Sequence, residues 1–312
     1  MRRPDGPYGR LIAVVGATAT GKTALAVSIA RATGGEIINA DSRQVYRGMD
    51  IGTAKPTREE QAAVRHWLID CAAPDEQFTL AAFLDAAHDA HDDITARGRT
   101  PVVAGGTGQY VWALLEGWRV PRVPPDVALR TELQALAARE GAAGLASLLR
   151  SEDPASADSI DPRNVRRIIR AIEVTRATGR PFSAWREKEG PPAEDVRIIG
   201  LDLPREALYA RIDARVDAML AAGLVDEVRG LIAAGYGCEL PSMSGIGYRQ
   251  VCAHLRGEMR LDAAAAEIKT ETHRLARMQH TWFRRDDPRI HWLDASAPDL
   301  NVSSLAAAGV PA

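Results

Sequence analysis

The sequence is poor in cysteine and carries almost no net charge. Only Cys71, Cys238 and Cys252 occur among 312 residues, too few and too scattered for a disulfide framework or a zinc site. We therefore expect free thiols, a reducing cytoplasmic location and no structural metal. The formal net charge of −2 gives no general attraction for nucleic acid, so such a partner has to be recognised by local clusters of Arg and Lys.

Long hydrophobic runs are also missing. Arg2 and Arg3 are followed by Pro, Asp and Gly, and the next apolar run spans only Leu11–Val15. This pattern predicts neither a signal peptide nor a membrane-spanning helix, and therefore no membrane partner. Hydrophobic residues still make up 46% of the chain and charged residues 26%, so we expect a folded globular protein with a sizeable core.

The segment after Leu11–Val15 matches a phosphate-binding loop. It follows the pattern G-x-x-x-x-G-K-[ST] between an expected strand and an expected helix, Ala24–Thr33. In such a loop backbone N–H groups and the helix start face an anion, the lysine adds positive charge, and the last hydroxyl ligates Mg²⁺. Thr23 is therefore the candidate metal ligand. The predicted phosphate-binding residues are Gly16, Ala17, Thr18, Ala19, Thr20, Gly21, Lys22 and Thr23.

Alternating short apolar runs and helical segments predict an α/β fold with a parallel, buried sheet. The expected strands are Leu11–Val15, Glu36–Ala40, His66–Asp70, Pro101–Ala104, Val196–Leu201 and Ile290–Leu293. Further helices are expected at Thr79–Arg97, Val111–Leu115, Pro204–Ala222, Leu224–Ala234 and Leu261–Arg285.

Two proline clusters enclose a purely helical block. Pro121, Pro124 and Pro125 interrupt the α/β rhythm, and Pro191 and Pro192 close the block before strand signals resume. The sequence thus predicts a P-loop NTPase-like core made of residues 1–121 and 191–312. Residues 122–190 form a helical insertion domain that we expect to bind RNA.

The RNA expectation for the insertion comes from a stripe of arginines. Residues 163, 166, 167 and 170 are all Arg at helical spacing, while the apolar residues 165, 168, 169 and 172 repeat the same spacing on the opposite face. A second basic segment near the C-terminus includes Lys269, Arg274, Arg277, Arg284 and Arg285. Positive charge mixed with hydrogen-bond donors and Trp282 suits phosphate-backbone contact, and a solvated helix face is the alternative.

Two polar segments follow expected strands at the edge where parallel α/β sheets bind ligands. Asp41 follows the second strand, and a carboxylate there can ligate Mg²⁺, cap a helix or act as a general base. Gly105, Gly106 and Thr107 follow a later strand and can bring N–H groups and a hydroxyl to the same edge, or merely form a turn.

Beyond these general features, the segment from Asp41 to Lys55 reads D-S-R-Q-V-Y-R-G-M-D-I-G-T-A-K, and with it the chain resembles the tRNA dimethylallyltransferases, also called tRNA isopentenyltransferases. The likeness covers nearly the whole chain. Its other motifs are the phosphate loop, His66 with residues 68–70, Gly105-Gly106-Thr107 with Tyr110, Asn164–Glu173, Ser244–Gln250, and Gln279 with Thr281–Arg284. The chain departs from the family pattern at Ala17, Thr20, Trp67, His273 and Met278.

The resemblance implies transfer of a dimethylallyl group from dimethylallyl diphosphate to the exocyclic amine of the adenosine just 3′ of the anticodon, with Mg²⁺. Asp41 matches the family's general base, Thr107 the residue that orients the target base, and Arg215 the arginine that neutralises the leaving diphosphate. The phosphate loop then holds the diphosphate of the prenyl donor, although its pattern alone points to ATP. The implied partners are dimethylallyl diphosphate and the anticodon stem-loop of tRNA, bound by a cytoplasmic monomer.

By the same resemblance, a set of residues from four segments and two isolated positions is expected to contact tRNA. They are Asp41, Ser42, Arg43, Gln44, Thr107, Arg130, Arg166, Arg167, Ile168, Ile169, Arg170, Ser244, Gly245, Ile246, Gly247, Tyr248, Arg249, Arg277, Gln279, Trp282 and Arg284.

Two other functions use the same phosphate loop. A P-loop kinase for a small molecule would hold ATP there and could use Asp41 as its base, but the sequence shows no lid with paired arginines. A nucleotide-dependent RNA-binding switch would need a further strand-terminal Asp for Mg²⁺, and only Asp41 and Asp70 are available. Transfer of a prenyl group to tRNA accounts for more of the motifs.

Overall fold

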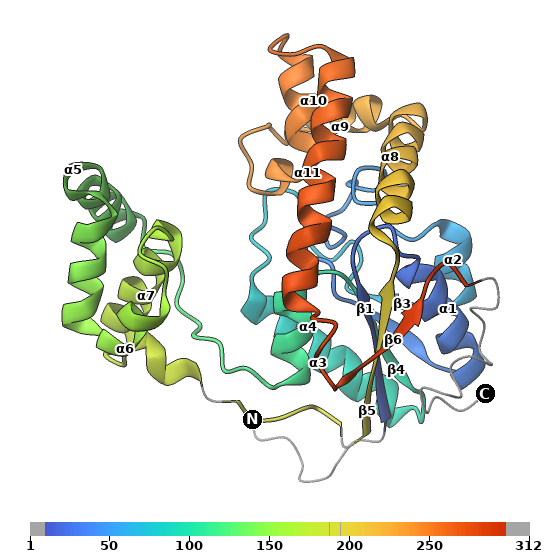
Figure 1. Ribbon diagram of the computed structural model, residues 1–312, viewed down its shortest axis with the longest axis horizontal. Helices are drawn as coiled ribbons and strands as arrows, with labels where there is room; N and C mark the ends of the chain where they lie inside the picture. Colours follow the sequence, from blue (N-terminus) through green and yellow to red (C-terminus); the bar gives the residue numbers. More distant parts are fainter. Residues whose placement is uncertain (1–9, 187, 194, 298–312) are drawn as a thin grey trace. The chain divides into compact units, whose positions relative to one another are not determined.

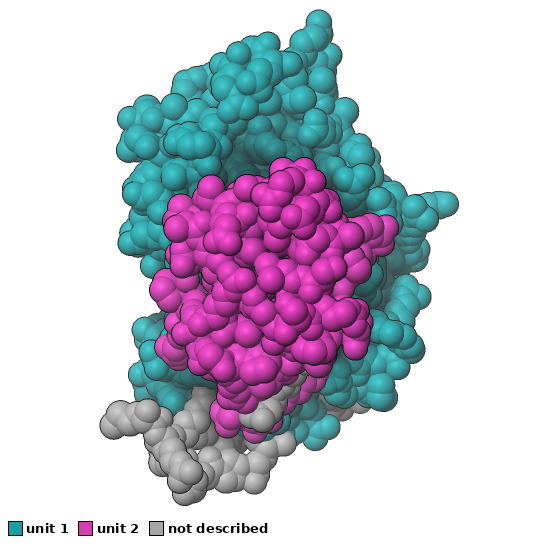
Figure 2. All heavy atoms as spheres, turned by 90° about the vertical axis from the view of Figure 1, so that its left-hand side faces the viewer, with its two compact units in different colours: residues 1–115, 191–312 teal, residues 116–190 magenta. Residues whose placement is uncertain are grey.

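The structure is a computed structural model that describes residues 10–186, 188–193 and 195–297. It divides into two compact units, unit 1 with residues 1–115 and 191–312, and unit 2 with residues 116–190 (Figure 2). The domain boundary that the sequence predicts after residue 121 therefore lies inside unit 2.

Unit 1 contains one six-stranded sheet in which every neighbouring pair is parallel. The strand order is β3-β2-β4-β1-β5-β6, so β1 lies in the middle of the sheet. The α/β prediction with a parallel sheet is confirmed. The strands are β1 (Arg10–Gly16), β2 (Glu36–Asn39), β3 (His66–Trp67), β4 (Pro101–Ala104), β5 (Asp195–Asp202) and β6 (Ile290–Asp294).

One predicted strand is much shorter than expected. His66–Asp70 was expected to be extended, but only His66 and Trp67 pair with β2. Leu68 and Asp70 adopt positive φ values of 62° and 56°, which are incompatible with a strand. The segment instead turns away from the sheet at this point.

Helices cover both faces of the sheet, with α1 on one side and α3 and α4 on the other (Figure 1). The short helices α2 and α10 were not predicted. The helices of unit 1 are α1 (Lys22–Thr33), α2 (Arg58–Ala63), α3 (Leu80–Ala96), α4 (Gly108–Leu115), α8 (Arg205–Ala221), α9 (Leu224–Ala233), α10 (Tyr248–Leu255) and α11 (Leu261–Trp282), with a 3₁₀ turn η2 (Ser242–Ser244). In the part of the chain that the structure describes, none of the helices is both long and apolar enough to cross a membrane.

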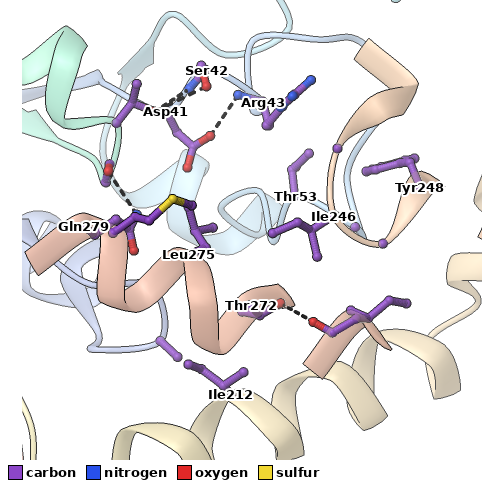
Figure 3. Close-up of a pocket in the computed structure, with 18 of the residues that line it drawn as sticks. Asp41, Ser42, Arg43, Thr53, Ile212, Ile246, Tyr248, Thr272, Leu275 and Gln279 are labelled. Atoms are coloured by element: carbon purple, nitrogen blue, oxygen red, sulfur yellow. Dashed lines mark hydrogen bonds between the residues drawn. The ribbon is translucent and has the colours of Figure 1, made fainter. Parts of the chain in front are cut away.

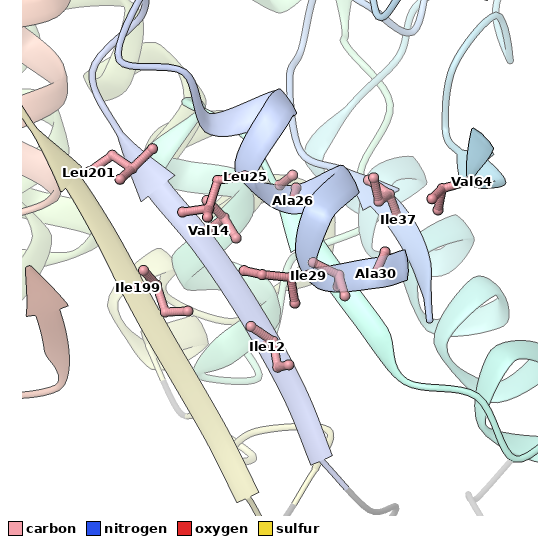
Figure 4. Packing of buried hydrophobic residues seen from close by; sticks show 12 residues of the cluster. Ile12, Val14, Leu25, Ala26, Ile29, Ala30, Ile37, Val64, Ile199 and Leu201 are labelled. Atoms are coloured by element: carbon pink, nitrogen blue, oxygen red, sulfur yellow. The ribbon is translucent and has the colours of Figure 1, made fainter. Parts of the chain in front are cut away.

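The core beneath the phosphate loop is built from alternate residues of the central strands. Ile12 and Val14 of β1 and Ile199 of β5 face Leu25 and Ile29 of α1, and all five side chains are buried (Figure 4). Burying a side chain of this size contributes about 1.5–3 kcal/mol. This packing fixes the start of α1 against the end of β1, and with it the loop between them.

Unit 2 is helical, as predicted. Its helices pack around Leu133, Leu145 and Ile172, while Arg166 and Arg167 are exposed, so α7 has the apolar and basic faces that its sequence indicates. The elements are α5 (Val127–Glu152), which is interrupted at Gly141, α6 (Pro154–Ser159), α7 (Val165–Thr178) and the 3₁₀ helix η1 (Phe182–Arg186).

The expectation that all three cysteines are thiols is wrong. Cys238, in the loop after α9, and Cys252, in α10, form a disulfide, and only Cys71 is free. The turn between the two helices brings Cα atoms 14 positions apart in sequence to within 6.0 Å. Sequence spacing carries no signal for that approach. Cysteine content therefore gives no support for a reducing compartment.

Gly16 ends β1 at a point where only glycine fits, and this gives a stability prediction. Its φ is +141°, and an added Cβ would meet the backbone oxygen of Leu201 in β5. We expect Gly16→Ala to lower the free energy of unfolding by about 3 kcal/mol or more, from strain and overpacking combined. Gly34→Ala is the matched control, because Gly34 has φ +61° but open space around its Cβ. Chemical denaturation measures both, and equal losses would contradict the steric argument.

Candidate active site at the phosphate loop

The phosphate loop leaves the start of α1 open to an anion. Gly21, in the left-handed conformation, precedes the helix, and neither a capping side chain nor an acidic residue occupies its first turn. Inside the loop, Thr20 Oγ1 donates to the Ala17 carbonyl at 2.9 Å and Lys22 Nζ donates to the same oxygen at 2.6 Å. The unpaired N–H groups of the first helical turn are thus available to a phosphate.

Lys22 is held in an environment that disfavours its charge. The pKa of its ammonium falls from 10.5 to about 8, chiefly because of burial and secondly because of the nearby Arg215 charge, while Asp41 opposes the shift. A phosphate group bound at this position would favour the charged form of the ammonium.

Arg215 reaches the loop from a distant part of the sequence. It lies on α8, and its Nη1 donates to Thr18 Oγ1 at 3.3 Å. Burial lowers the pKa of its guanidinium, while the Asp41 carboxylate partly offsets this. The structure therefore brings together Lys22, Arg215 and Asp41, as the sequence predicts.

Asp41 and Thr107 follow the carboxyl ends of β2 and β4, in two loops that are hydrogen-bonded to each other. Thr107 Oγ1 accepts from the Ser42 N–H at 3.0 Å, and Asp41 Oδ1 accepts from the Arg43 N–H at 2.8 Å. The turn and general-base interpretations of Asp41 are therefore compatible. One oxygen fixes the carboxylate in place, and within the described residues no hydrogen bond involves the other.

These groups surround a cavity of about 440 Å³. Asp41, Thr107 and Arg215 all line it, together with the predicted RNA-contacting residues 244–248. In Figure 3 the Asp41 carboxylate points from its turn toward α11, where Leu275 and Gln279 lie. Apolar residues such as Ile212, Met219 and Leu275 complete the lining, and these were missed because nothing distinguishes them in sequence from core residues.

A second cavity of about 770 Å³ shares two lining residues with the first. Arg215 and Met219 line both cavities, and Lys55 and Asp70 line only the second. The Lys55 ammonium is buried and donates to Asp70 Oδ1 at 2.6 Å, to Asp50 Oδ1 and to the Tyr46 carbonyl. All of its protons are therefore used to fix the loop after Asp41.

Gln279 has a different environment from the RNA contact that the sequence suggests. Its side chain is 8% exposed, its Oε1 accepts from the Thr18 N–H at 2.7 Å, and its Nε2 donates to the Gly106 carbonyl at 2.9 Å. The amide thus joins α11 to the phosphate loop and to the loop that carries Thr107. Its predicted contact with tRNA stays a prediction, but both ends of the side chain are already engaged.

The four arginines of unit 2 that are predicted to contact tRNA fall into two groups. Arg130 and Arg170 both bind the buried Glu173 carboxylate, at 2.8 and 2.6 Å, and Arg170 also donates to the carbonyls of Pro121 and Val123. Burial tends to raise the pKa of Glu173, but hydrogen bonds from Arg130 and Arg170 hold it below its ordinary value. This network holds α5 and α7 together.

The exposed residues Arg166 and Arg167 form the other group. Within residues 116–186 and 188–190, no hydrogen bond or ion pair involves either of their guanidinium groups. They are the arginines of this stripe that remain available to RNA phosphates.

Most cations of the second basic segment are paired internally. Lys269 binds Asp217, Arg274 binds Glu271, Arg284 binds Asp286 and Arg285 binds Asp202. Arg277 instead donates to the Tyr209 hydroxyl at 2.8 Å. The positive charge of this segment is thus largely neutralised before any RNA binds.

The residues around the loop suit Mg²⁺ only in partnership with a phosphate ligand. No group of three or more His, Cys, Asp or Glu side chains arranged for a metal exists among the described residues. Mg²⁺ commonly keeps several waters and uses few protein ligands when substrate phosphates supply the others. Thr23, in the first turn of α1, fits that limited role.

The fold and the phosphate-loop motif define a P-loop α/β protein, and a cavity lined by the Asp41 carboxylate adjoins that loop. Comparison then gives the family: residues 44–286 match the IPP transferase model, and the chain belongs to this family. It is 56% identical over 290 residues to the tRNA dimethylallyltransferase of Roseiflexus sp. (strain RS-1), covering 93% of this chain and 94% of that protein. The corresponding protein of Chloroflexus aurantiacus is 53% identical, with 88% and 93% covered.

Solved structures agree with this assignment. The tRNA isopentenylpyrophosphate transferase of Bacillus halodurans superposes with a TM-score of 0.70 and 38% identity, covering 96% of this chain and 94% of that one. A eukaryotic dimethylallyltransferase acting on tRNA superposes with a TM-score of 0.82 and 28% identity, covering 96% and 77%.

The lowered pKa of Lys22 makes a prediction about stability and pH. Its folded-state pKa of about 8 is below the ordinary 10.5, so the folded state binds the proton more weakly than the unfolded state does. The ligand-free fold therefore loses the most stability below pH 8, and this loss decreases as the pH rises to 10.5. We expect Lys22→Met to raise the free energy of unfolding at pH 7 by about 2 kcal/mol, and the gain to fade by pH 10.5. Denaturant titrations at both pH values measure this. Lys188→Met, at an exposed lysine, is the control, and a pH-independent change would contradict the account.

Gln279 gives a second prediction at this site. Gln279→Ala removes both hydrogen bonds of the side-chain amide. The phosphate loop is then no longer linked through this side chain to the loop after β4. We expect KM for the diphosphate substrate to rise about tenfold, because each lost buried bond costs about 1 kcal/mol. Thr270→Ala changes an exposed hydroxyl on the same helix and should leave KM unchanged. An unchanged KM for Gln279→Ala would show that the amide does not position the loop.

Proposed function

We propose that the protein transfers a dimethylallyl group from dimethylallyl diphosphate to the exocyclic amine of the adenosine immediately 3′ of the anticodon in tRNA. The observation that carries the proposal is the meeting of three groups at one cavity. The phosphate loop with Lys22 offers an anion site, Arg215 adjoins it, and Asp41 faces the same space. A kinase for a small molecule could use the same loop and Asp41, and its need for ATP distinguishes it from the transferase.

The diphosphate belongs on the phosphate loop. Its negative charge is matched by the N–H groups at the start of α1 and by the Lys22 and Arg215 side chains, which the protein holds close together without an internal counterion of equal charge. Because charge builds on the leaving group as its bond to carbon breaks, these contacts strengthen in the transition state. When bound, Mg²⁺ would be held by Thr23 and the diphosphate and would neutralise further charge.

Asp41 acts on the nucleophile, the exocyclic amine of the adenine. The nitrogen of the adenine amine forms a bond to the first carbon of the prenyl group while the bond from that carbon to the diphosphate oxygen breaks. An adenine amine is a weak nucleophile, so its proton has to leave as the new bond forms, and Asp41 accepts it. The Arg43 N–H fixes the carboxylate, and Thr107, in the loop after β4, holds the turn after β2 by accepting from the Ser42 N–H.

The target base has to leave the anticodon stack to enter the cavity. Such extrusion costs a few kcal/mol, which contacts with the RNA backbone have to offset. Arg166 and Arg167 of unit 2 supply positive charge for such contacts, and the residues 244–248 line the cavity into which the base goes. Binding of ATP by the loop is no part of the proposal. A monomeric state and a cytoplasmic location stay predictions.

The direct test is incubation with Mg²⁺, dimethylallyl diphosphate and a tRNA transcript with consecutive adenosines after the anticodon. We expect a mass gain of one prenyl group on an adenosine and no need for ATP. ATP consumption without that gain would support the kinase alternative and end the proposal.

Replacing Asp41 separates catalysis from binding. Asp41→Asn keeps the shape and the bond to the Arg43 N–H but cannot accept the proton. We expect kcat to fall by about 10²–10⁴, the usual contribution of a general base, with tRNA affinity within a factor of two or three. Equal losses of kcat and of tRNA affinity would assign Asp41 to binding alone.

The two groups of arginines in unit 2 make a further prediction. Arg166→Ala with Arg167→Ala should weaken tRNA binding and reduce the slope of log affinity against log salt by about 1–2, because each phosphate contact contributes about 0.7–0.9 to it. Arg139→Ala with Arg150→Ala is the control, since these residues pair with Glu140 and Asp158 on the surface of the same unit. A slope equal to that of the control would return α7 to the solvated-face interpretation.

A further inference from the structure

Glu227 collects four hydrogen-bond donors from two segments that are far apart in the sequence. Its Oε2 accepts from the N–H groups of Asp50 and Ile51 at 2.9 and 2.7 Å. Its Oε1 accepts from the Gly52 N–H at 3.2 Å and from the Tyr248 hydroxyl at 2.7 Å. No sequence motif had pointed to this residue, which lies in the first turn of α9.

The arrangement resembles an anion site that the protein fills with its own side chain. Three consecutive backbone N–H groups form a concave donor surface that suits a negative charge. A neutral amide in place of the carboxylate has only one acceptor oxygen and would present its NH₂ group to the remaining donors. The charge of Glu227 is therefore needed to hold all four donors at once.

Both segments held by Glu227 are walls of the reaction cavity. Gly52 and Thr53 line it on one side, and Gly247 and Tyr248 line it on the other, while Glu227 does not reach it. The two walls also touch directly, because a Cβ on Gly52 would lie 2.5 Å from the Tyr248 ring. Burial and the adjacent Glu227 carboxylate raise the pKa of Tyr248, so its hydroxyl stays protonated as a donor.

Further hydrogen bonds connect these two walls to the turn that carries Asp41, the proposed base. Gln44 Nε2 donates to the carbonyls of Thr53 and Ala54, both at 3.1 Å, which ties the loop held by Glu227 to the turn after β2. Arg43 donates to the carbonyls of Pro241 and Ser242 just before the other wall. None of these bonds involves the phosphate loop, so the Glu227 network supports the acceptor side of the cavity and not its diphosphate side.

We propose that Glu227 is a positioning residue that shapes the part of the cavity receiving the acceptor base of the RNA, by fixing residues 50–53 against Tyr248. The proposal rests on the proposed function for the identity of the acceptor. Glu227 touches no reacting atom and acts only through the two walls.

The test uses the full chain with Glu227→Gln, and with Asp226→Asn as the matched control. Asp226 is the neighbouring residue of α9 and pairs with Arg229 on the surface. We expect Glu227→Gln to raise KM for the tRNA transcript about tenfold or more, because bonds to a charged group are lost. KM for dimethylallyl diphosphate should stay within twofold, and Asp226→Asn should match the unaltered protein in both constants. A merely structural loss lowers the active fraction and kcat without this split, and that outcome would overturn the proposal.

Tyr248→Phe tests the link between the two walls. It removes one of the four donors and leaves the backbone donors in place, so its effect on KM for tRNA should be smaller. Because the two residues share one bond, the effects of Glu227→Gln and Tyr248→Phe should be less than additive in the double variant. Full additivity would show that Glu227 does not act through Tyr248.

A binding measurement keeps the proposal testable if no prenyl transfer occurs. Fluorescence anisotropy compares an anticodon stem-loop RNA with the same RNA lacking the base just 3′ of the anticodon. The unaltered protein should bind the complete RNA more tightly, and Glu227→Gln should lose that preference while Asp226→Asn keeps it. Equal preference in Glu227→Gln would contradict the positioning role, whereas an inactive but discriminating protein would contradict only the proposed transfer.

Discussion

The site depends on two partly buried cations that form no ion pair with any of the described residues. Lys22 of α1 and Arg215 of α8 are far apart in the sequence and meet at the phosphate loop, where burial lowers the pKa of each and Arg215 adds to the shift of Lys22. Asp41 compensates them in part, but it is fixed by its own turn. This concentration of positive charge lowers the stability of the ligand-free fold and favours a ligand with several negative charges.

The sheet makes this arrangement possible because the carboxyl ends of its parallel strands meet at one edge. β1 ends in the phosphate loop, β2 in Asp41 and β4 in the loop of Thr107, and Gln279 of α11 bonds to two of these loops. The proposed function assigns the two cations to the leaving group, the Asp41 carboxylate to the nucleophile, and the Glu227 network to the cavity wall on the acceptor side. Each part is set by hydrogen bonds between segments that are remote in sequence.

The sequence predicts much of this arrangement, for physical reasons that differ between elements. Buried parallel strands are nearly uniform apolar runs, so Leu11–Val15 and Pro101–Ala104 were located correctly. Motif chemistry predicted the phosphate loop, the position after a strand predicted Asp41 at the sheet edge, and resemblance predicted that Arg215 acts beside the loop, where the structure places it. Short elements such as α2 and α10 were missed, and His66–Asp70 was wrong beyond Trp67, because left-handed φ values at Leu68 and Asp70 leave no sequence signal.

The sequence could not show which polar groups already form hydrogen bonds or ion pairs within the protein. Arg170 has the spacing of an RNA-contacting residue, yet it binds Glu173 and two carbonyls. Gln279 and Glu227 form hydrogen bonds with backbone groups more than 170 positions away. Pairing of Cys238 with Cys252 likewise depends on a turn between helices. Such contacts arise only when the chain is folded, so composition and periodicity carry no record of them.

The central claim is that the phosphate loop holds a leaving diphosphate and not a nucleoside triphosphate. The most direct measurement is a single turnover with tRNA, Mg²⁺ and dimethylallyl diphosphate labelled in its phosphates, without ATP. The account predicts one inorganic diphosphate released for each prenylated adenosine, and loss of both products in Lys22→Met. Release of orthophosphate, or prenylation that requires ATP, would contradict it.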